Sequence, residues 1–232
     1  MVQVFTFVVT EGSVIDAPEY AAALRNLGVS AAELNRLRMK LSLVGGTRRA
    51  IIEVSAGLAS LTLRPFSPTP DEITVDSSPL RDERTHPHVF GPDLGWQRFT
   101  LASLPAHEGL LVDASSRVPQ AITAPFVTVA MDGSSSVTVS GHPATTPSIA
   151  LDGVLDILAW RGAHVVTAPE GFRVNELMSR ETWVVDPVHG ARLVTGWREY
   201  GTVVRGRTAV NRGGIPTHRE INEARAMRAT VI

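Results

Sequence analysis

The sequence contains no cysteine. This absence excludes disulfide bonds, cysteine nucleophiles and metal centres held by thiolates. A cytoplasmic location is therefore the default expectation.

The chain also lacks an excess of charge and a long apolar run. Its formal net charge is −1 over 232 residues, so the basic surface typical of nucleic-acid or anionic-membrane binding is not expected. No apolar run approaches the ~20 residues that cross a bilayer. Hydrophobic residues make up 44% of the chain, which is enough for a real core in one large domain or two small ones.

Lysine is the scarcest charged residue. Among 22 lysines and arginines, Lys40 is the single lysine. Leu34, Leu37 and Leu41 recur at helical spacing and predict a helix over residues 30–43, with Lys40 beside the apolar stripe. Side-chain amine chemistry is thus limited to one position, where a solvated lysine is expected.

Strand and helix patterns alternate irregularly and predict an α+β fold. Strands are expected at 2–9, 51–55 and 59–64, and helices at 18–26 and 30–43. Residues 65–79 are proline-rich and predict a loop with at most a short strand at 73–75. Short strands, helices over 151–161 and 174–179, and a helical tail from residue 221 to 232 follow. We predict a small α+β domain over 1–80, a linker over 81–93 and a larger pseudo-barrel domain over 94–232.

Two segments carry a family resemblance. They are Thr85-His-Pro-His-Val-Phe-Gly-Pro-Asp-Leu-Gly-Trp96 and Glu181-Thr-Trp-Val-Val-Asp-Pro-Val-His-Gly-Ala-Arg-Leu-Val-Thr-Gly-Trp197. The second is similar, without a gap, to E-V-W-L-x-N-A-L-H-G-I-R-P-V-T-x-W of class IV aminotransferases and aminodeoxychorismate lyases, which use pyridoxal phosphate (PLP). The resemblance extends over about residues 11 to 200. It implies the two-domain fold-type IV fold of D-amino acid and branched-chain aminotransferases, acting as a homodimer.

The chain departs from this family at the positions that hold the cofactor. Relatives read V-K-G-P-D-L-x-W in the first segment, and their lysine forms the Schiff base, whereas this chain has Phe90, which has no amine. The phosphate-binding arginine corresponds to Ile51, the glutamate at the pyridine nitrogen to Gln120, and the phosphate-binding threonine to Ala150. A second phosphate-side segment becomes Asp186-Pro187. We therefore predict that PLP does not bind.

The remaining polar residues of these segments are the candidates for chemistry. In an extended segment, alternation would place His86, His88 and Phe90 on one side. His88 is either a general acid or base in the cleft or a surface histidine, and His86-x-His88 lacks a third metal ligand. Asp186 is either a new acid or base or the cap of a turn, and Arg192 is expected to pair with a substrate carboxylate.

The substrate-binding candidates are the positions that replace the cofactor contacts, together with one histidine. Gln120 is expected either to face ligand or to pair with backbone, and His189 to stabilise a turn. The full set of substrate-binding candidates is Phe90, Gln120, His86, Ile51 and Ala150.

Three functions are consistent with this pattern. The first is a PLP-independent enzyme that performs isomerisation, elimination, cyclisation or hydrolysis on a small carboxylated metabolite, in specialised biosynthesis. The second is a non-catalytic pseudoenzyme that binds a ligand or an active paralogue. The third is a PLP-dependent aminotransferase or lyase, which requires the correspondence to fail at all five positions.

Overall fold

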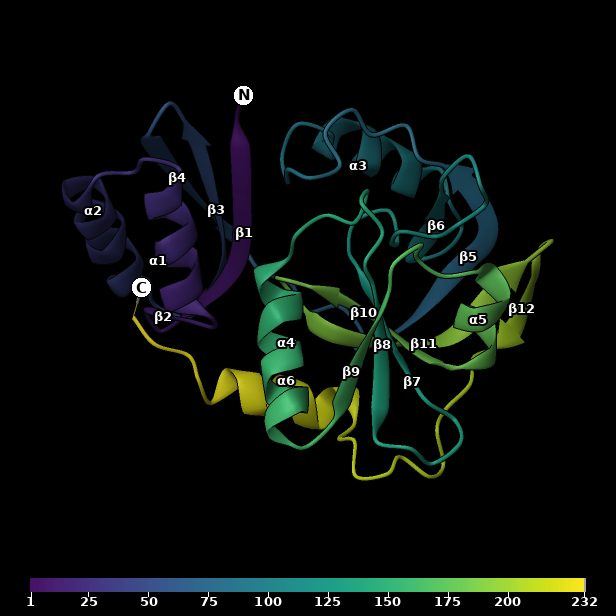
Figure 1. Ribbon diagram of the computed structural model, residues 1–232. Helices are drawn as coiled ribbons and strands as arrows, with labels where there is room; N and C mark the ends of the chain where they lie inside the picture. The colour runs from purple at the N-terminus through teal and green to yellow at the C-terminus, as the bar shows by residue number, and fades with distance from the viewer. Residues whose placement is uncertain (232) are drawn as a thin grey trace.

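A computed structural model describes residues 1–231, which fold into two β-sheets with helices packed on them (Figure 1). The first sheet is antiparallel, with the order β2-β1-β3-β4. Its strands are β1 (Gln3–Thr10), β2 (Ser13–Val14), β3 (Thr47–Ser55) and β4 (Leu58–Pro65). Two helices, α1 (Ala17–Asn26) and α2 (Ala31–Ser42), cover its outer face.

Alternation along β1 and β3 gives the first sheet two different faces. Phe7, Ala50 and Ile52 point to the helices and are buried in one apolar cluster with Leu37 and Leu41 of α2. The residues between them in sequence point to the other face, toward the second part of the molecule. This inner face of the first sheet forms one wall of the candidate site.

The second sheet has eight strands and mixes parallel with antiparallel pairs. Its order is β6-β5-β11-β10-β7-β8-β9, and β12 pairs with β11. The strands are β5 (Glu72–Arg81), β6 (Glu108–Val112), β7 (Phe126–Val129), β8 (Ser136–Ser140), β9 (His164–Ala168), β10 (Glu181–Asp186), β11 (Gly190–Glu199) and β12 (Thr202–Arg205). The helices of this part are α3 (Leu94–Ala102), α4 (Ile149–Trp160), α5 (Val174–Ser179) and α6 (His218–Ala226).

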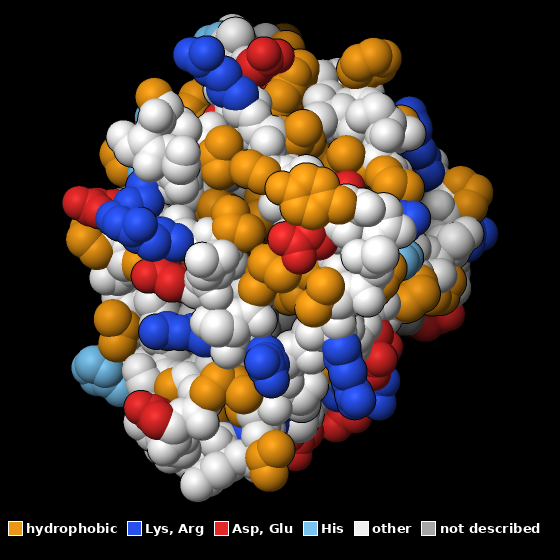
Figure 2. All heavy atoms as spheres, turned by 90° about the vertical axis from the view of Figure 1, so that its right-hand side faces the viewer, with side chains coloured by type: hydrophobic (Ala, Val, Ile, Leu, Met, Phe, Trp, Pro, Cys, Tyr) orange, Lys and Arg blue, Asp and Glu red, His pale blue; other side chains and the backbone are white. Residues whose placement is uncertain are grey.

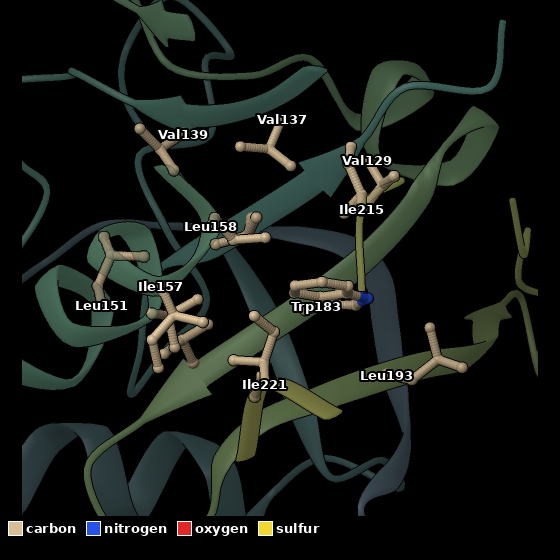
Figure 3. Close-up of a cluster of buried hydrophobic side chains, with 14 of the residues drawn as sticks. Val129, Val137, Val139, Leu151, Ile157, Leu158, Trp183, Leu193, Ile215 and Ile221 are labelled. Atoms are coloured by element: carbon tan, nitrogen blue, oxygen red, sulfur yellow. The ribbon is translucent and has the colours of Figure 1, made fainter. Parts of the chain in front are cut away.

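Trp183 of β10 lies at the centre of the main core (Figure 3). Its ring is fully buried and packs against a cluster that includes Ile157 and Leu158 of α4 and Ile221 of α6. Its indole Nε1 donates to Glu181 Oε1 at 2.8 Å, which satisfies the one polar atom of the ring. This packing fixes β10, and with it Asp186 at the strand's carboxyl end.

The structure corrects several sequence expectations. Residues 72–81 are not a loop with one short strand but form β5, which pairs in parallel with β11 and β6. The chain therefore changes from one sheet to the other between Pro65 and Glu72, before the expected linker at 81–93. Helix α3 and strand β12 were not predicted. The tail helix begins earlier, at His218, and ends at Ala226; residue 232, which the tail prediction included, lies outside the described residues.

The outer surface of the second part is mixed in character. Figure 2 shows hydrophobic side chains gathered across the middle of this face, with basic and acidic side chains around them. Exposed apolar residues occur on the nearby elements α3 and β12, including Phe99 and Val203. Within residues 1–231, no helix is long and apolar enough to cross a membrane.

Candidate functional site

The segment before α3 is a turn that anchors Phe90 between the two sheets. The Val89 N–H donates to the His86 carbonyl at 3.0 Å, and the Asp93 carboxylate accepts the backbone N–H groups of Thr85 and His86 at 3.0 and 2.8 Å. The expected extended conformation is therefore wrong, because these hydrogen bonds curl the chain.

Phe90 is then attached to the first sheet. The N–H of Val4 in β1 donates to the Phe90 carbonyl at 2.8 Å. Gly91 follows with φ 136°, and a Cβ there would lie 3.0 Å from the Val4 nitrogen, so only glycine fits this close approach.

Three neighbouring cavities share the Phe90 side chain. Their volumes are about 650, 250 and 90 Å³. The largest lies against the inner face of the first sheet, and the 250 Å³ cavity reaches the carboxyl end of β10. The charged and titratable residues that line the 250 Å³ cavity are Arg49, Arg98, His107, Glu108, Asp186, His189 and Arg192.

Glu108, the first residue of β6, is a buried carboxyl in the lining of the 250 Å³ cavity. Its side chain is 1% exposed, and Thr123 donates to it through the hydroxyl and, at 3.4 Å, through the backbone N–H. Burial raises the pKa of Glu108 to about 7, against the opposing effects of the Thr123 hydroxyl and the Arg192 charge. A carboxyl with this pKa both takes up and releases protons near neutral pH.

Asp186 closes the turn between β10 and β11. Its Oδ1 accepts the N–H groups of Val188 and His189, both at 2.8 Å, and the His189 Nδ1 lies 3.1 Å from the carboxylate. Burial raises the pKa of Asp186, but the His189 hydrogen bond and the Arg192 charge outweigh burial, and the pKa lies below its ordinary value. Asp186 therefore stays ionised, and His189 belongs to the same turn.

Arg192 lies between the two carboxylates. Its Nη2 is 3.0 Å from Asp186 Oδ2 and 3.9 Å from Glu108 Oε1. Its Nε is buried and has no hydrogen-bond partner in the described chain. The single positive charge of Arg192 thus acts on two acidic groups at different distances. The nearer one remains ionised, and the farther one is left with a pKa close to neutral.

Two further arginines line the cavity from other elements. Arg49 of β3 donates from Nε to Thr6 Oγ1 at 3.0 Å, and Arg98 extends from α3. Burial lowers the pKa of Arg49, the positive charge of Arg98 lowers it further, and the Asp186 carboxylate partly opposes both effects. The two guanidinium groups lie on a wall suited to the carboxylate of a ligand.

No protein-family model and no curated protein sequence matches the chain. Solved structures do match over nearly its whole length. A putative branched-chain amino acid aminotransferase from Thermotoga maritima superposes with a TM-score of 0.72 at 13% identity, covering 96% of this chain and 83% of that one. For 4-amino-4-deoxychorismate lyase from Pseudomonas aeruginosa, the TM-score is 0.68 at 15% identity, with coverage of 96% and 89%. A fold IV-transaminase from Curtobacterium pusillum gives 0.68 at 16% identity, with coverage of 98% and 84%.

The chain has the fold-type IV aminotransferase fold. The α+β class and the fold predicted from the two motif segments are confirmed, because the neighbours carry the same arrangement over 96% or more of this chain. The identities of 13 to 16% make this a statement about the scaffold alone.

On this fold-type IV scaffold, the three residues expected to be catalytic do not all meet. Asp186 and Arg192 are in contact in the 250 Å³ cavity. His88 lines the 90 Å³ cavity instead, and His86 lines the 650 Å³ cavity together with Ile51. The turn at residues 86–89 separates the two histidines, so alternation does not apply to them.

Gln120 and Ala150 lie outside the three cavities. Both are fully buried. The Gln120 Oε1 accepts the Thr146 N–H at 2.7 Å, while its Nε2 has no partner in the described chain. Ala150 packs in the main core at the start of α4. Of the two roles expected for Gln120, the structure shows pairing with backbone. Neither side chain is placed to touch a ligand in these cavities.

Sequence reasoning missed Glu108 and Arg49, although both had a signal. Arg49 is two residues before Ile51, so it points to the same side of β3. Glu108 precedes the apolar run Gly109-Leu-Leu-Val112, and an acidic residue at a buried strand seldom lacks a role. Arg98 had no comparable signal, because helix α3 was not predicted.

Proposed function

We propose that this protein is a PLP-independent enzyme that performs acid–base chemistry on a small carboxylated metabolite. The observation that carries the proposal is the position of Glu108. A buried carboxyl with a pKa of about 7 lines a 250 Å³ cavity that Arg49 and Arg98 also line. A proton-transfer group and a carboxylate-binding wall in one cavity are the components that such a reaction requires.

Three features support an enzyme that works without PLP. Phe90 has no amine, and Lys40 lies exposed on α2, on the far side of the first sheet from the cavities. Asp186 holds the N–H groups of Val188 and His189 with its own carboxylate. A phosphate at this turn would meet that negative charge, and Pro187 offers no N–H. This donor set does not fit a cofactor phosphate.

The proposed roles follow from the contacts. The substrate carboxylate pairs with Arg49 and Arg98, which places the neighbouring carbon toward Glu108. Glu108 then removes or delivers the proton, with Thr123 orienting its carboxyl group. Asp186 and Arg192 act as positioning residues, since their ion pair fixes the charge beside Glu108. Isomerisation, elimination and cyclisation all begin with such a step.

The test is a panel of small carboxylic and 2-oxo acids incubated with the protein in D2O, with C–H exchange and turnover followed by NMR. We expect exchange at the carbon next to the carboxylate, or next to the keto group in the 2-oxo acids, reduced about 100-fold or more in Glu108→Gln. Glu19→Gln, the same change at an exposed position, is the matched control. Equal exchange in Glu108→Gln and the parent contradicts the assignment.

The alternative is the non-catalytic ligand- or partner-binding module. The observation in its favour is the 90 Å³ cavity, which is bordered by Phe90, Tyr20 and Pro187 and has room for only a few water molecules. A panel in which no compound is exchanged or consumed favours this alternative, especially if a second subunit co-purifies.

We further propose a homodimer. The exposed apolar side chains of α3 and β12 support this assembly, since surfaces of this kind often mark protein contacts. Sedimentation equilibrium of the parent and of Val203→Glu tests it. A parent that sediments as a monomer at micromolar concentration contradicts the proposal.

A further inference from the structure

We propose that the 650 Å³ cavity is a subsite for a second acidic group of the substrate, a phosphate or a second carboxylate held by Arg64 together with Arg49 and Arg98, which lie between the two acidic groups and are shared by them. The inference rests on the proposed function in one respect: it places this group on the molecule that reaches Glu108. The anion-binding subsite itself stands on separate observations.

The first observation is an arginine pair on adjacent strands. Arg49 of β3 is directly opposite Arg64 of β4 in the register of the first sheet. Both line the 650 Å³ cavity from the same face. Like charges directly opposite on neighbouring strands destabilise a sheet, so this pair has a cost that a bound anion would remove.

The second observation is that, within residues 1–231, no carboxylate forms an ion pair with these arginines, although Asp186 acts on Arg49 at longer range. Arg98 approaches from α3 and lines the same cavity. Neither the Arg64 nor the Arg98 side chain makes a hydrogen bond or an ion pair within residues 1–231, and the hydrogen bond of the Arg49 side chain to Thr6 uses only Nε. The charges are close enough to interact, because burial, the charge of Arg98 and, to a smaller extent, the charge of Arg64 lower the pKa of Arg49, and the Asp186 carboxylate only partly opposes them.

One carboxylate, that of Glu53, also lines this cavity. It lies four residues beyond Arg49 on β3, which is about 13 Å along an extended strand. The end of the cavity at Arg49 and Arg64 is therefore positive, and the end at Glu53 is the acidic one.

The third observation is that the cavities adjoin. Arg49 and Arg98 line both the 650 Å³ and the 250 Å³ cavity, while Arg64 lines only the larger. A molecule with an acidic group at Arg64 and Arg98 can therefore extend past these shared arginines into the cavity that contains Glu108. Planar guanidinium groups bind carboxylate and phosphate oxygens in pairs. The substrate class is a small molecule with two acidic groups, one near Arg64 and the other near the reacting carbon.

The experiment uses the full chain with inorganic phosphate and succinate as probes, titrated by calorimetry at constant ionic strength set with sodium chloride. We expect at least one probe to bind, with its Kd weakened about tenfold or more in Arg64→Gln and in Arg98→Gln. Arg48→Gln is the matched control, because Arg48 neighbours Arg49 on β3 but points to the opposite face. Binding of phosphate alone or of succinate alone identifies which acidic group the subsite takes.

Two results overturn the proposal. One is that neither probe binds the parent more tightly than chloride does. The other is that both probes bind the parent, Arg64→Gln and Arg98→Gln with the same Kd. A separate readout is the Tm without anion, which we expect Arg64→Gln to leave unchanged or raise, since it removes a repulsion.

Failure here is distinguishable from failure of the proposed function. Glu108→Gln is expected to bind the two probes as the parent does, because Glu108 does not line the 650 Å³ cavity. If Glu108→Gln loses exchange but no probe binds the parent, only the subsite proposal is contradicted. If a probe binds but Glu108→Gln exchanges as fast as the parent, only the acid–base assignment is contradicted.

Discussion

The Nη2 atom of Arg192 lies 3.0 Å from Asp186 Oδ2 and 3.9 Å from Glu108 Oε1. These three groups belong to three different strands, and all are at least nine-tenths buried. One arginine therefore holds two acidic groups in different states, with Asp186 ionised and Glu108 near its titration point. The proposed acid–base role of Glu108 depends on this difference in protonation.

Asp186→Asn tests the ion pair. The change removes the charge that faces Arg192 while keeping an oxygen for the turn, and it leaves the buried guanidinium with only the more distant Glu108 as an acidic neighbour. We expect the free energy of unfolding to fall by about 3 kcal/mol or more. Asp71→Asn removes a carboxylate from the half-exposed ion pair with Arg219 and is expected to cost less than about 1 kcal/mol. Urea unfolding measures both, and equal losses in the two variants would contradict the buried pair.

The raised pKa of Glu108 makes the free energy of unfolding depend on pH in a specific direction. Because burial raises its pKa from 4.5 to about 7, the folded chain keeps a proton that the unfolded chain releases between these values. The contribution of this residue to stability is therefore fully present below about pH 4.5 and is lost as the pH rises through about 7.

Glu108→Gln removes that loss. Between pH 4.5 and pH 8, the free energy of unfolding of the variant is expected to rise relative to that of the parent by on the order of 3 kcal/mol. Urea unfolding at a series of pH values measures the difference. A parent-to-variant difference that stays constant with pH contradicts the raised pKa.

His88 is expected to matter little for the chemistry. It lines the 90 Å³ cavity and not the one that contains Glu108. His88→Ala should change the exchange rate by no more than about twofold, whereas removing a true acid or base costs about 100-fold or more. A loss in His88→Ala as large as that in Glu108→Gln would return His88 to the catalytic group.

Arg84 is expected to fasten the segment before Phe90 to the second part of the protein. Its buried guanidinium bonds Asp82 at 2.6 Å, Thr146 at 2.7 Å and the Ala144 carbonyl at 2.6 Å. Arg84→Gln should lower the free energy of unfolding by about 3 kcal/mol. The exposed Arg81→Gln is the control and should change it by less than about 0.5 kcal/mol. Similar effects of the two changes would contradict the structural role of Arg84.

Helices whose apolar spacing is set by neighbouring residues were predicted well, because that spacing is visible in a short stretch of sequence. The helix at Val174–Ser179 has the bounds predicted from the sequence. Strand β5 was predicted only as a short strand at 73–75, because its proline, Pro79, argues against a longer strand and because its parallel partner β11 is more than 100 residues away along the chain. Pairing over such a distance leaves no local pattern.

The candidate site was predicted only in part. Asp186 and Arg192 share one motif, and their contact follows from the pairing of β10 with β11. Glu108 reaches them only through the parallel sheet order β6-β5-β11, which no motif encodes. His88 was placed by assuming an extended chain, and the hydrogen bonds of Asp93 bend that chain instead.

The most direct test of the account is an absorbance spectrum of the purified protein with one equivalent of PLP, before and after borohydride reduction. The account predicts no new protein-bound band between ~320 and ~430 nm and no reduced adduct on any peptide, with Lys40→Arg behaving like the parent. A borohydride-stable adduct on the peptide containing Lys40, absent in Lys40→Arg, would contradict the account and restore a PLP-dependent aminotransferase or lyase.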